Sequence, residues 1–505
     1  MGTTGGPAVH HANVGTNNLT GPERAVVDAV PRQLLVGGEW RSASGATTFS
    51  VEDPSTGDSL CEVADATPAD GLAALDAAAA VQETWARHPA RERGEILRRA
   101  YAALVARADE LALLMTLEMG KPLAESRAEI VYAADFLRWF GEEAVRIDGR
   151  YTVGPSGRGR ILVMRQPVGP CLLITPWNFP MAMGTRKIGP AVAAGCTMVV
   201  KPASQTPLSM LMLARILEES GLPHGVLNVV TTSDAGSLTE PLLADPRLRK
   251  LSFTGSTGVG RRLIAQAAPQ VLRMSMELGG NAPFLVFGDA DLDAAVDGAV
   301  IAKMRNIGEA CTAANRFLVA EAVADEFSSR LAQRLRTMVV GRGSDPATEV
   351  GPLIDQAGRR KVTELVEDAV TRGATVLTGG TAIDGPGYFY SPTVLTGVAG
   401  GARILHEEVF GPVAPITTFA DDDEAIAAAN NTEFGLVAYV FTRDLARGLR
   451  VIESLQTGMV GLNQGMVSNA SAPFGGVKQS GFGREGGAEG IHEYLSVKYV
   501  AVDAP

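Results

Sequence analysis

Short apolar runs alternate with helical segments between residues 160 and 275. The runs cover residues 171–174, 197–200, 226–230 and 251–254. This β-α-β rhythm predicts a parallel sheet covered by helices. Ligands of such sheets bind at the carboxyl ends of the strands, so the residues that follow each run are candidates for a binding site. The candidates are Trp177 and Asn178 after the first run, Lys201 after the second, and Gly255 and Ser256 after the fourth.

A second alternating block extends from residue 282 to about residue 480. Its first run, 282–287, predicts a strand, and helical patterns follow over residues 290–306 and 357–372. We interpret the block as a second α/β domain that faces the first. Upstream of both blocks, residues 34–40 suggest a hairpin, and Thr67 before Pro68 is a good N-cap and first residue of a helix.

The two ends of the chain follow neither pattern. Residues 1–32 are rich in Gly, Thr, Asn and Pro without periodicity, which predicts a flexible tail. Residues 494–502 predict an edge strand, and residues 145–167 are hairpin-like.

Composition excludes several classes of function. A chain of 505 residues with 46% hydrophobic and 20% charged residues is long enough for two or three soluble domains. A net charge of −11 argues against nucleic acid and anionic membranes as partners. Apolar stretches stay well short of the roughly 20 residues that span a bilayer, and no secretory signal is visible. The four cysteines lack CxxC spacing or His partners, which predicts free thiols in a reducing cytoplasm and no metal site.

One cysteine is a candidate nucleophile. Cys311 has only small neighbours, within the segment Gly-Glu-Ala-Cys-Thr-Ala-Ala-Asn-Arg-Phe, and these leave room for a substrate. A lone Cys is more often a small core residue. Five other segments favour the catalytic interpretation: 175–180 (TPWNFP), 253–257 (FTGST), 276–281 (MELGGN), 407–412 (EEVFGP) and 473–481 (PFGGVKQSG).

Together with Cys311, these segments resemble the motifs of the aldehyde dehydrogenase superfamily, in the family's order. The resemblance covers nearly everything from Leu34 to the C-terminus. It implies an α/β fold with a Rossmann-type cofactor domain, an α/β catalytic domain and a small β oligomerisation arm. We expect a tail at 1–32, the cofactor domain at 33–144 and 168–279, the catalytic domain at 280–480, and the arm at 145–167 and 481–505.

The resemblance assigns three catalytic roles. Cys311 matches the nucleophile that adds to the aldehyde carbonyl. The Asn178 side chain and the Cys311 backbone N–H match the pair that stabilises the oxyanion. Glu277 matches the base that activates water to hydrolyse the thioester, so we expect a free carboxylate product rather than transfer to coenzyme A. The alternatives, judged locally, are a turn residue for Asn178 and a solvated or capping carboxylate for Glu277.

The cofactor site follows from related matches. Residues 255–260 follow a strand and open a helix, so backbone N–H groups could hold a pyrophosphate, although the usual GxGxxG spacing is absent. The resemblance places a dinucleotide against Thr175, Pro176, Trp177, Lys201, Ser204, Gly255, Ser256, Leu278, Glu408 and Phe410. Glu408 and Phe410 match the positions that hold the nicotinamide ribose and ring. Ser204 stands where NAD-preferring members carry a Glu, and Ser204 beside Lys201 would accept a 2′-phosphate, so we expect NADP, with NAD possible.

Three further residues narrow the substrate. Arg186, Arg305 and Ser468 match the residues that bind the substrate carboxylate in succinate semialdehyde dehydrogenases. Without that context, solvated helix arginines would be the preferred interpretation. Some relatives have a second Cys two residues after the nucleophile as a redox switch, but Ala313 occupies that position here, so no such local disulfide is expected.

The sequence therefore predicts a cytoplasmic homodimer or homotetramer that oxidises succinate semialdehyde with NADP through a Cys thiohemiacetal and a thioester, in 4-aminobutyrate breakdown. A dehydrogenase of glutarate semialdehyde or another aldehyde is the close alternative. A thiol hydrolase or esterase that uses Cys311 and Glu277 without redox chemistry, and a non-catalytic structural relative, are alternatives from other classes.

Overall fold

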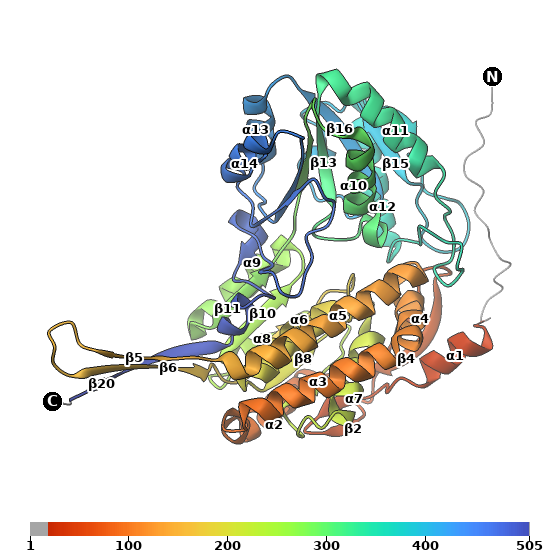
Figure 1. Cartoon of the computed structure of the whole chain (residues 1–505). Coiled ribbons are helices and arrows are strands. Elements are labelled where there is room, and N and C mark those ends of the chain that lie inside the picture. Colours follow the sequence, from red (N-terminus) through yellow and green to blue (C-terminus); the bar gives the residue numbers. More distant parts are fainter. Residues whose placement is uncertain (1–18, 504–505) are drawn as a thin grey trace.

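The computed structural model describes residues 19–503, and its largest sheet has eight strands (Figure 1). The order is β19 (Gly481–Phe482), β11 (Arg273–Glu277), β10 (Lys250–Thr254), β7 (Cys171–Ile174), β8 (Met198–Lys201), β9 (Leu227–Val229), β1 (Leu34–Val36) and β2 (Glu39–Arg41). The strands from β11 to β9 pair in parallel, which confirms the prediction from the four apolar runs. The expected hairpin at residues 34–40 is confirmed by the antiparallel pair β1–β2.

Helices cover both faces of this sheet because alternate strand residues point to opposite sides. Cys171 and Leu173 pack with helices α3 (Ala90–Ala106), α4 (Ala108–Met119), α5 (Leu123–Glu143), α6 (Ala182–Ala194) and α7 (Pro207–Glu219). Leu172 and Ile174 face α2 (Pro68–Ala86), α8 (Ala235–Ala244) and α9 (Thr257–Ala267). The predicted start of α2 is confirmed, since Thr67 and Asp70 form a capping box around it.

The second block forms a seven-stranded sheet. Its order is β14 (Thr375–Thr378), β15 (Thr393–Thr396), β16 (Val413–Phe419), β13 (Ala314–Ala320), β12 (Ala282–Val286), β17 (Val437–Phe441) and β18 (Met459–Leu462). On one face lie α10 (Leu292–Met304), α11 (Ala324–Arg336) and α12 (Gln356–Thr371), and on the other α13 (Asp422–Asn430) and α14 (Leu445–Ser454). The carboxyl ends of strands in the first sheet and the loop before β13 meet at the candidate site described below.

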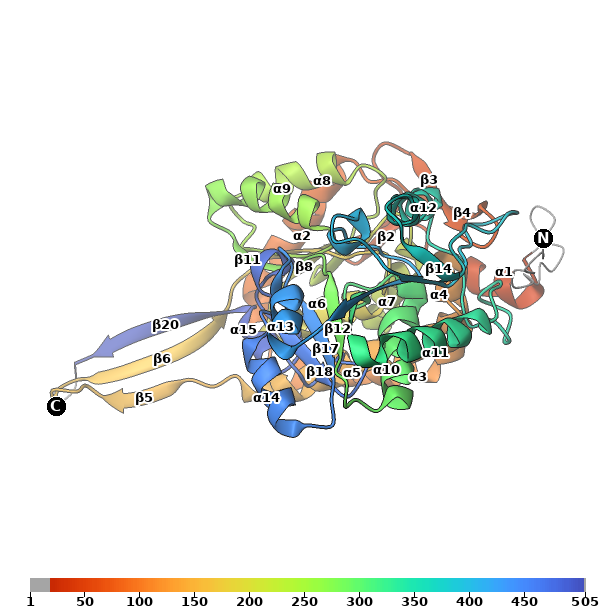
Figure 2. The same ribbon diagram turned by 90° about the horizontal axis from the view of Figure 1, so that it is seen from above.

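A three-stranded antiparallel arm extends from the body in both views (Figures 1 and 2). It consists of β5 (Arg150–Val153), β6 (Arg160–Pro167) and the edge strand β20 (Leu495–Val502), which confirms the hairpin and edge-strand predictions. The arm begins later than the expected residue 481. Gly481 and Phe482 pair with β11 instead, and a helical turn, α15 (Glu489–His492), precedes β20. Glycine suits this pairing because a Cβ at Gly481 would lie 1.9 Å from the Met276 carbonyl oxygen.

The N-terminal prediction needs a correction. Residues 1–18 of the expected tail lie outside the described residues, but α1 (Gly21–Asp28) is a helix, so the flexible tail is wrong for this part. Thr20 and Glu23 form a capping box, and Val27 is buried against the core. Arg342 forms ion pairs with Glu23 and with Asp53 at the end of β3 (Thr48–Asp53), which pairs with β4 (Asp58–Ala64).

Candidate active site

Cys311 lines a cavity of about 270 Å³ between the two sheets. The first sheet contributes residues at and beyond the carboxyl ends of β7, β10 and β11, as its parallel order predicts. The second contributes the loop before β13, the start of α12 and the segment before β16. The lining residues include Pro176, Trp177, Asn178, Gly255, Ser256, Glu277, Leu278, Cys311, Glu408 and Phe410. Most of the predicted catalytic and cofactor residues therefore meet in one place.

The loop that carries Cys311 is held in an unusual conformation. Asn306, Ile307 and Gly308 have φ values of 56°, 62° and 77°, a left-handed run that non-glycine residues rarely adopt. The Tyr439 hydroxyl donates to the Thr312 carbonyl at 2.9 Å. A Cβ at Gly280 would lie 2.3 Å from the Cys311 carbonyl oxygen, so only glycine allows this approach. Several tertiary contacts thus fix the Cys311 loop before substrate arrives.

Cys311 is partly exposed to the cavity, and poor solvation there controls the ionisation of its thiol. Loss of solvation raises the pKa of the thiol to about 12, with Arg186 and Arg305 opposing the shift and Glu408 and Glu277 adding to it. The thiol is therefore protonated at neutral pH in this form, and attack on a carbonyl needs a group that accepts its proton.

Asn178 lies on the loop after β7 and is buried. Its side-chain amide donates to the Glu309 carbonyl at 2.9 Å. The main-chain carbonyl of Asn178 accepts from Lys121 Nζ at 2.7 Å and from Asn306 Nδ2 at 3.0 Å. Because an amide nitrogen carries two hydrogens, one remains to donate into the cavity beside Cys311. This arrangement fits an oxyanion donor.

Glu277 ends β11 and is 3% exposed. Among the described residues, neither of its carboxyl oxygens has a hydrogen-bond partner. Burial raises its pKa well above the ordinary value, and the nearby Glu485 adds to the shift, while Arg186, Lys187 and Arg484 oppose it. A carboxyl with these properties in a cavity is suited to accept a proton from water.

The buried Glu277 predicts how stability depends on pH. Because its pKa is higher in the folded chain, the folded state keeps a proton that the unfolded chain has already released. Its contribution to stability is complete below the unfolded pKa and is lost as the pH rises through the folded pKa. We expect Glu277→Gln to raise Tm relative to wild type at mildly alkaline pH and to change it little at acidic pH, as measured by calorimetry across a pH series. An equal difference in Tm at every pH would contradict this.

The cofactor side of the cavity fits a dinucleotide. Ser256 caps α9 with extended backbone and without a side-chain cap bond, so the first N–H groups of the helix are available for a phosphate. Trp177 and Phe410 meet edge to face, with centroids 5.3 Å apart, and Phe410 has a φ of 53°. Glu408 Oε1 accepts from the Gly280 N–H at 3.0 Å. Thr175 N–H donates to the Lys201 carbonyl, which joins β7 to β8 at this edge.

Lys201 is the last residue of β8 and Ser204 lies three residues beyond it, and neither lines the Cys311 cavity. Lys201 Nζ donates to the Pro202 carbonyl at 2.8 Å, and burial lowers its pKa to about 8. The Ser204 hydroxyl donates to Gln205 Oε1 at 3.3 Å. No carboxylate forms an ion pair with Lys201 among residues 19–503, so its ammonium can accept an anionic group of a cofactor.

Arg305 and Ser468 meet in a second cavity of about 440 Å³. Arg305 Nη1 donates to the Ser468 hydroxyl at 3.2 Å. The guanidinium lies 4.8 Å from the centroid of Phe179, and Phe179 lines both cavities. The two predicted residues are thus separated from the Cys311 cavity by the ring of Phe179.

Arg186 lines neither cavity. It is 1% exposed, its Nε lies 2.6 Å from Glu485 Oε2, and its guanidinium stacks on Phe474. Lys187 Nζ lies 2.6 Å from the other oxygen of Glu485. Sequence reasoning missed Glu485. Two successive basic residues in a buried helix require an acidic partner, but nothing in the sequence says which one.

Four other residues at the site could not be identified from the sequence. Lys361 and Asp355, on and before α12, line the Cys311 cavity. Lys121 and Glu129 form a buried ion pair, with 2.5 Å between the charged atoms, beside the Asn178 loop. Charged residues such as these are most often solvent-exposed, so no local pattern in the sequence marks them as part of a site.

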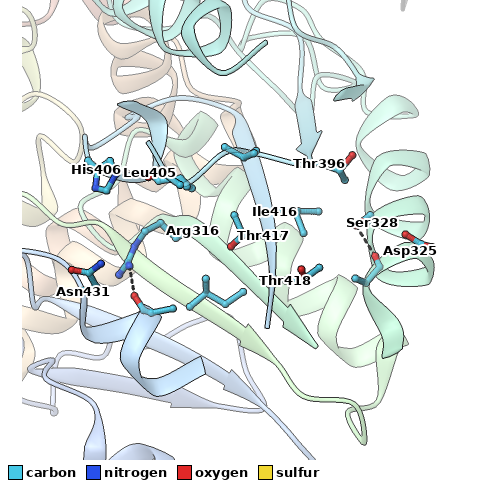
Figure 3. A pocket seen from close by; sticks show the side chains of 16 residues that line it. Arg316, Asp325, Ser328, Thr396, Leu405, His406, Ile416, Thr417, Thr418 and Asn431 are labelled. Carbon is cyan, nitrogen blue, oxygen red and sulfur yellow. Dashed lines mark hydrogen bonds between the residues drawn. The ribbon is translucent and has the colours of Figure 1, made fainter. Parts of the chain in front are cut away.

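A third cavity, of about 600 Å³, lies in the second block (Figure 3). Arg316 points into it, but each of its three guanidinium nitrogens donates to a backbone carbonyl, of Asn281, Ala428 or Ala429. The cavity brings no cysteine together with a base.

None of the helices within residues 19–503 combines the length and the apolar composition that a membrane span requires. The same residues hold no group of three or more His, Cys, Asp or Glu side chains that could bind a metal ion. The four thiols Cys61, Cys171, Cys196 and Cys311 are free.

Comparisons with known proteins agree with this geometry. The profile described as "Aldehyde dehydrogenase family" matches residues 40–500. The chain is 60% identical to the succinate-semialdehyde dehydrogenase of Paenarthrobacter nicotinovorans over 88% of its length and 99% of the relative's. It is 49% identical to the NADP(+) succinate-semialdehyde dehydrogenase of Escherichia coli, covering 93% and 98%, and 48% identical to the glutarate-semialdehyde dehydrogenase of Pseudomonas putida, also covering 93% and 98%.

The fold is likewise similar to solved structures. The crystal structure of succinate-semialdehyde dehydrogenase from Burkholderia pseudomallei superposes with a TM-score of 0.93 at 49% identity, covering 94% of this chain and 98% of that one.

Proposed function

This chain belongs to the aldehyde dehydrogenase family, and we propose that it oxidises succinate semialdehyde to succinate with NADP as the hydride acceptor. One observation carries the choice of substrate: Arg305 and Ser468 are bonded to each other in a cavity next to that of Cys311, with Phe179 between them. A cation and a hydroxyl there suit an aldehyde whose far end is a carboxylate. The two most similar relatives reported above are named for the same substrate.

The reaction follows from the residues around Cys311. The Cys311 thiol first gives up its proton to solvent water, and the thiolate then adds to the aldehyde carbon while the Asn178 amide and the Cys311 backbone N–H donate to the developing oxyanion. When bound, the oxidised nicotinamide supplies the acceptor for the hydride that leaves this carbon. The product is a thioester on Cys311, and the electron pair of the C–H bond leaves with the hydride.

Hydrolysis of the thioester uses Glu277. Its carboxylate removes a proton from water, the resulting hydroxide attacks the thioester carbon, and the Cys311 sulfur leaves as a thiolate. The acid is released ionised, so each turnover consumes one aldehyde, one NADP and one water and releases two protons. The raised pKa of Glu277 suits a base that must accept a proton from water and then return it.

We propose NADP as the preferred cofactor because Ser204 leaves room and Lys201 supplies positive charge. Replacing Ser204 with Glu places a like charge against a 2′-phosphate, which disfavours NADP selectively. We expect Ser204→Glu to weaken the binding of NADP by tenfold or more and to change NAD binding little. About 1.4 kcal/mol of repulsion corresponds to that ratio. The kcat/KM for each cofactor measures this, with Ser204→Ala as the neutral control. A wild type that already prefers NAD would refute the argument.

A panel of aldehydes tests the substrate. Succinate semialdehyde, glutarate semialdehyde and butanal are compared with both cofactors by the absorbance of the reduced nicotinamide. Succinate semialdehyde with NADP should give the highest kcat/KM. A preference for glutarate semialdehyde, the substrate in the name of the Pseudomonas putida relative, would replace the substrate proposal. Release of acid from esters without any nicotinamide reduction would favour a thiol hydrolase.

The remaining assignments are proposals of the same kind. The arm presents exposed apolar side chains, among them Tyr151, Val497 and Tyr499, which suits contact with a second copy in a homodimer or homotetramer. We place the enzyme in the cytoplasm and in 4-aminobutyrate degradation. We propose that residues 33–144 and 168–279 form the cofactor domain, together with β19, and that residues 280–480 form the catalytic domain.

A further inference from the structure

The start of α5 contacts both loops of the active site. Glu125 Oε2 accepts from the Asn306 N–H at 2.5 Å, just before Cys311 in the chain. Glu129 Oε1 accepts from the N–H groups of Met181 and Ala182 at 3.0 and 3.1 Å, where α6 begins. These carboxyl groups tie the segment after Asn178 and the segment before Cys311 to one helix.

Lys121, which lies just before α5, completes this arrangement. Its ammonium is 1% exposed and donates to Glu129 Oε2 at 2.5 Å and to the Asn178 carbonyl at 2.7 Å. It also lies 4.4 Å from the centroid of the Phe179 ring. A buried ion pair is costly to desolvate, and apolar side chains of similar volume often replace one without loss of stability. What an apolar pair cannot do is donate to the Asn178 carbonyl.

The contact bears on the direction of the Asn178 amide. Lys121 and Asn306 both donate to the Asn178 carbonyl, and the Glu309 carbonyl takes one of the two side-chain amide hydrogens. The main chain and the side chain of Asn178 are therefore held independently. An error of about 1 Å in the position of a catalytic group can cost on the order of 100-fold in rate.

We propose that Lys121 is a positioning residue for the oxyanion site, acting through its bond to the Asn178 carbonyl. The inference rests on the proposed role of Asn178 in aldehyde oxidation. Since every aldehyde passes through the same oxyanion, Lys121 supports the oxidation of charged and uncharged aldehydes alike.

Lys121 also lines the cavity of Arg305, so a direct contact with the substrate carboxylate is the competing role. Glu129 argues against it. Its carboxylate oxygen lies 2.5 Å from the ammonium and neutralises it. Arg305 is instead bonded to a neutral hydroxyl there.

The test compares Lys121→Met with Lys121→Met/Glu129→Gln, in which no unpaired buried charge remains and the Gln oxygen can still accept from Met181 and Ala182. We expect both variants to lose about 100-fold in kcat/KM for succinate semialdehyde and for butanal, the loss that a misplaced catalytic group causes. The dissociation constant for NADP, measured by fluorescence titration, should stay unchanged because Lys121 lies outside the Cys311 cavity.

A double-mutant cycle separates positioning from simple stability. If Lys121 acts through Asn178, then Asn178→Ala/Lys121→Met loses no more activity than Asn178→Ala alone. Arg342→Met, which breaks a distant ion pair, is the control and should lower Tm without lowering kcat.

Three outcomes would overturn the inference. Recovery of activity together with Tm in Lys121→Met/Glu129→Gln would make Lys121 a structural contact. A loss confined to succinate semialdehyde would make it a carboxylate ligand. Additive losses in the cycle would separate it from Asn178. A wild type that reduces no nicotinamide with any aldehyde would instead refute the proposed function, and an active Asn178→Ala would refute the role of Asn178.

Discussion

The Glu277→Gln variant is expected to reduce about one nicotinamide per active site in a burst and then to stop. Addition and hydride transfer need Cys311 and the oxyanion donors, whereas hydrolysis of the thioester needs a base. Glu277 is the cavity carboxyl whose two oxygens are both without partners in the described part of the chain, so neither oxygen would have to give up a bond to accept from water. Steady turnover should fall by roughly 10²- to 10⁴-fold, the usual contribution of a general base.

Stopped-flow absorbance of the reduced nicotinamide measures the burst, and the mass of the denatured protein identifies the acyl group on Cys311. Cys311→Ala is the matched control and should show neither burst nor turnover, because no thiohemiacetal can form. Normal steady turnover by Glu277→Gln would refute its role as the hydrolytic base. A missing burst would assign Glu277 to activation of the thiol, whose pKa of about 12 also calls for a proton acceptor.

The main architecture could be predicted from sequence because buried parallel strands are short and continuously apolar. All four residues of β7 and all five of β12 are buried and apolar, which is the pattern that the runs at 171–174 and 282–287 express. The helix α1 was missed for a local reason. The helix has eight residues and lies within a stretch whose composition is that of a flexible tail. A capping box holds its first turn, and Glu23 in that turn pairs with Arg342, over 300 residues later in the chain.

The site shows a similar division. Cys311, Glu277 and Asn178 stand in distinctive local segments, so their meeting in one cavity could be expected. The partners of buried charges could not. Glu485 sits among glycines, and its bonds to Arg186 and Lys187 depend on how the loop before β20 folds back onto α6. Lys121 and Glu129 are eight residues apart and reach the active site only because α5 begins there.

The two arginines should have different effects when they are replaced. Arg305 is bonded to Ser468 in a cavity, and its guanidinium can bind a substrate carboxylate through charge-assisted hydrogen bonds. Such bonds contribute about 1.5 to 3 kcal/mol each, and about 2.7 kcal/mol corresponds to 100-fold in rate. We expect Arg305→Ala to lose roughly that factor in kcat/KM for succinate semialdehyde and to leave butanal nearly unchanged.

Arg186→Ala should slow the oxidation of both aldehydes. Arg186 lines neither cavity, and its main contact is the 2.6 Å ion pair with Glu485. Without Arg186, Glu485 keeps only Lys187 as a buried partner, and the positive charge that opposes the raised pKa values of Glu277 and Cys311 is lost. Both groups then become harder to ionise, which hinders attack and hydrolysis for any substrate.

The kcat/KM of each variant with succinate semialdehyde and with butanal measures the difference, and Arg273→Ala at the base of the arm is the control. If Arg186→Ala spares butanal, Arg186 must leave Glu485 and bind the substrate carboxylate directly. If Arg305→Ala slows butanal as much as the semialdehyde, the cavity of Arg305 does not select a carboxylate, and the substrate proposal reverts to a general aldehyde.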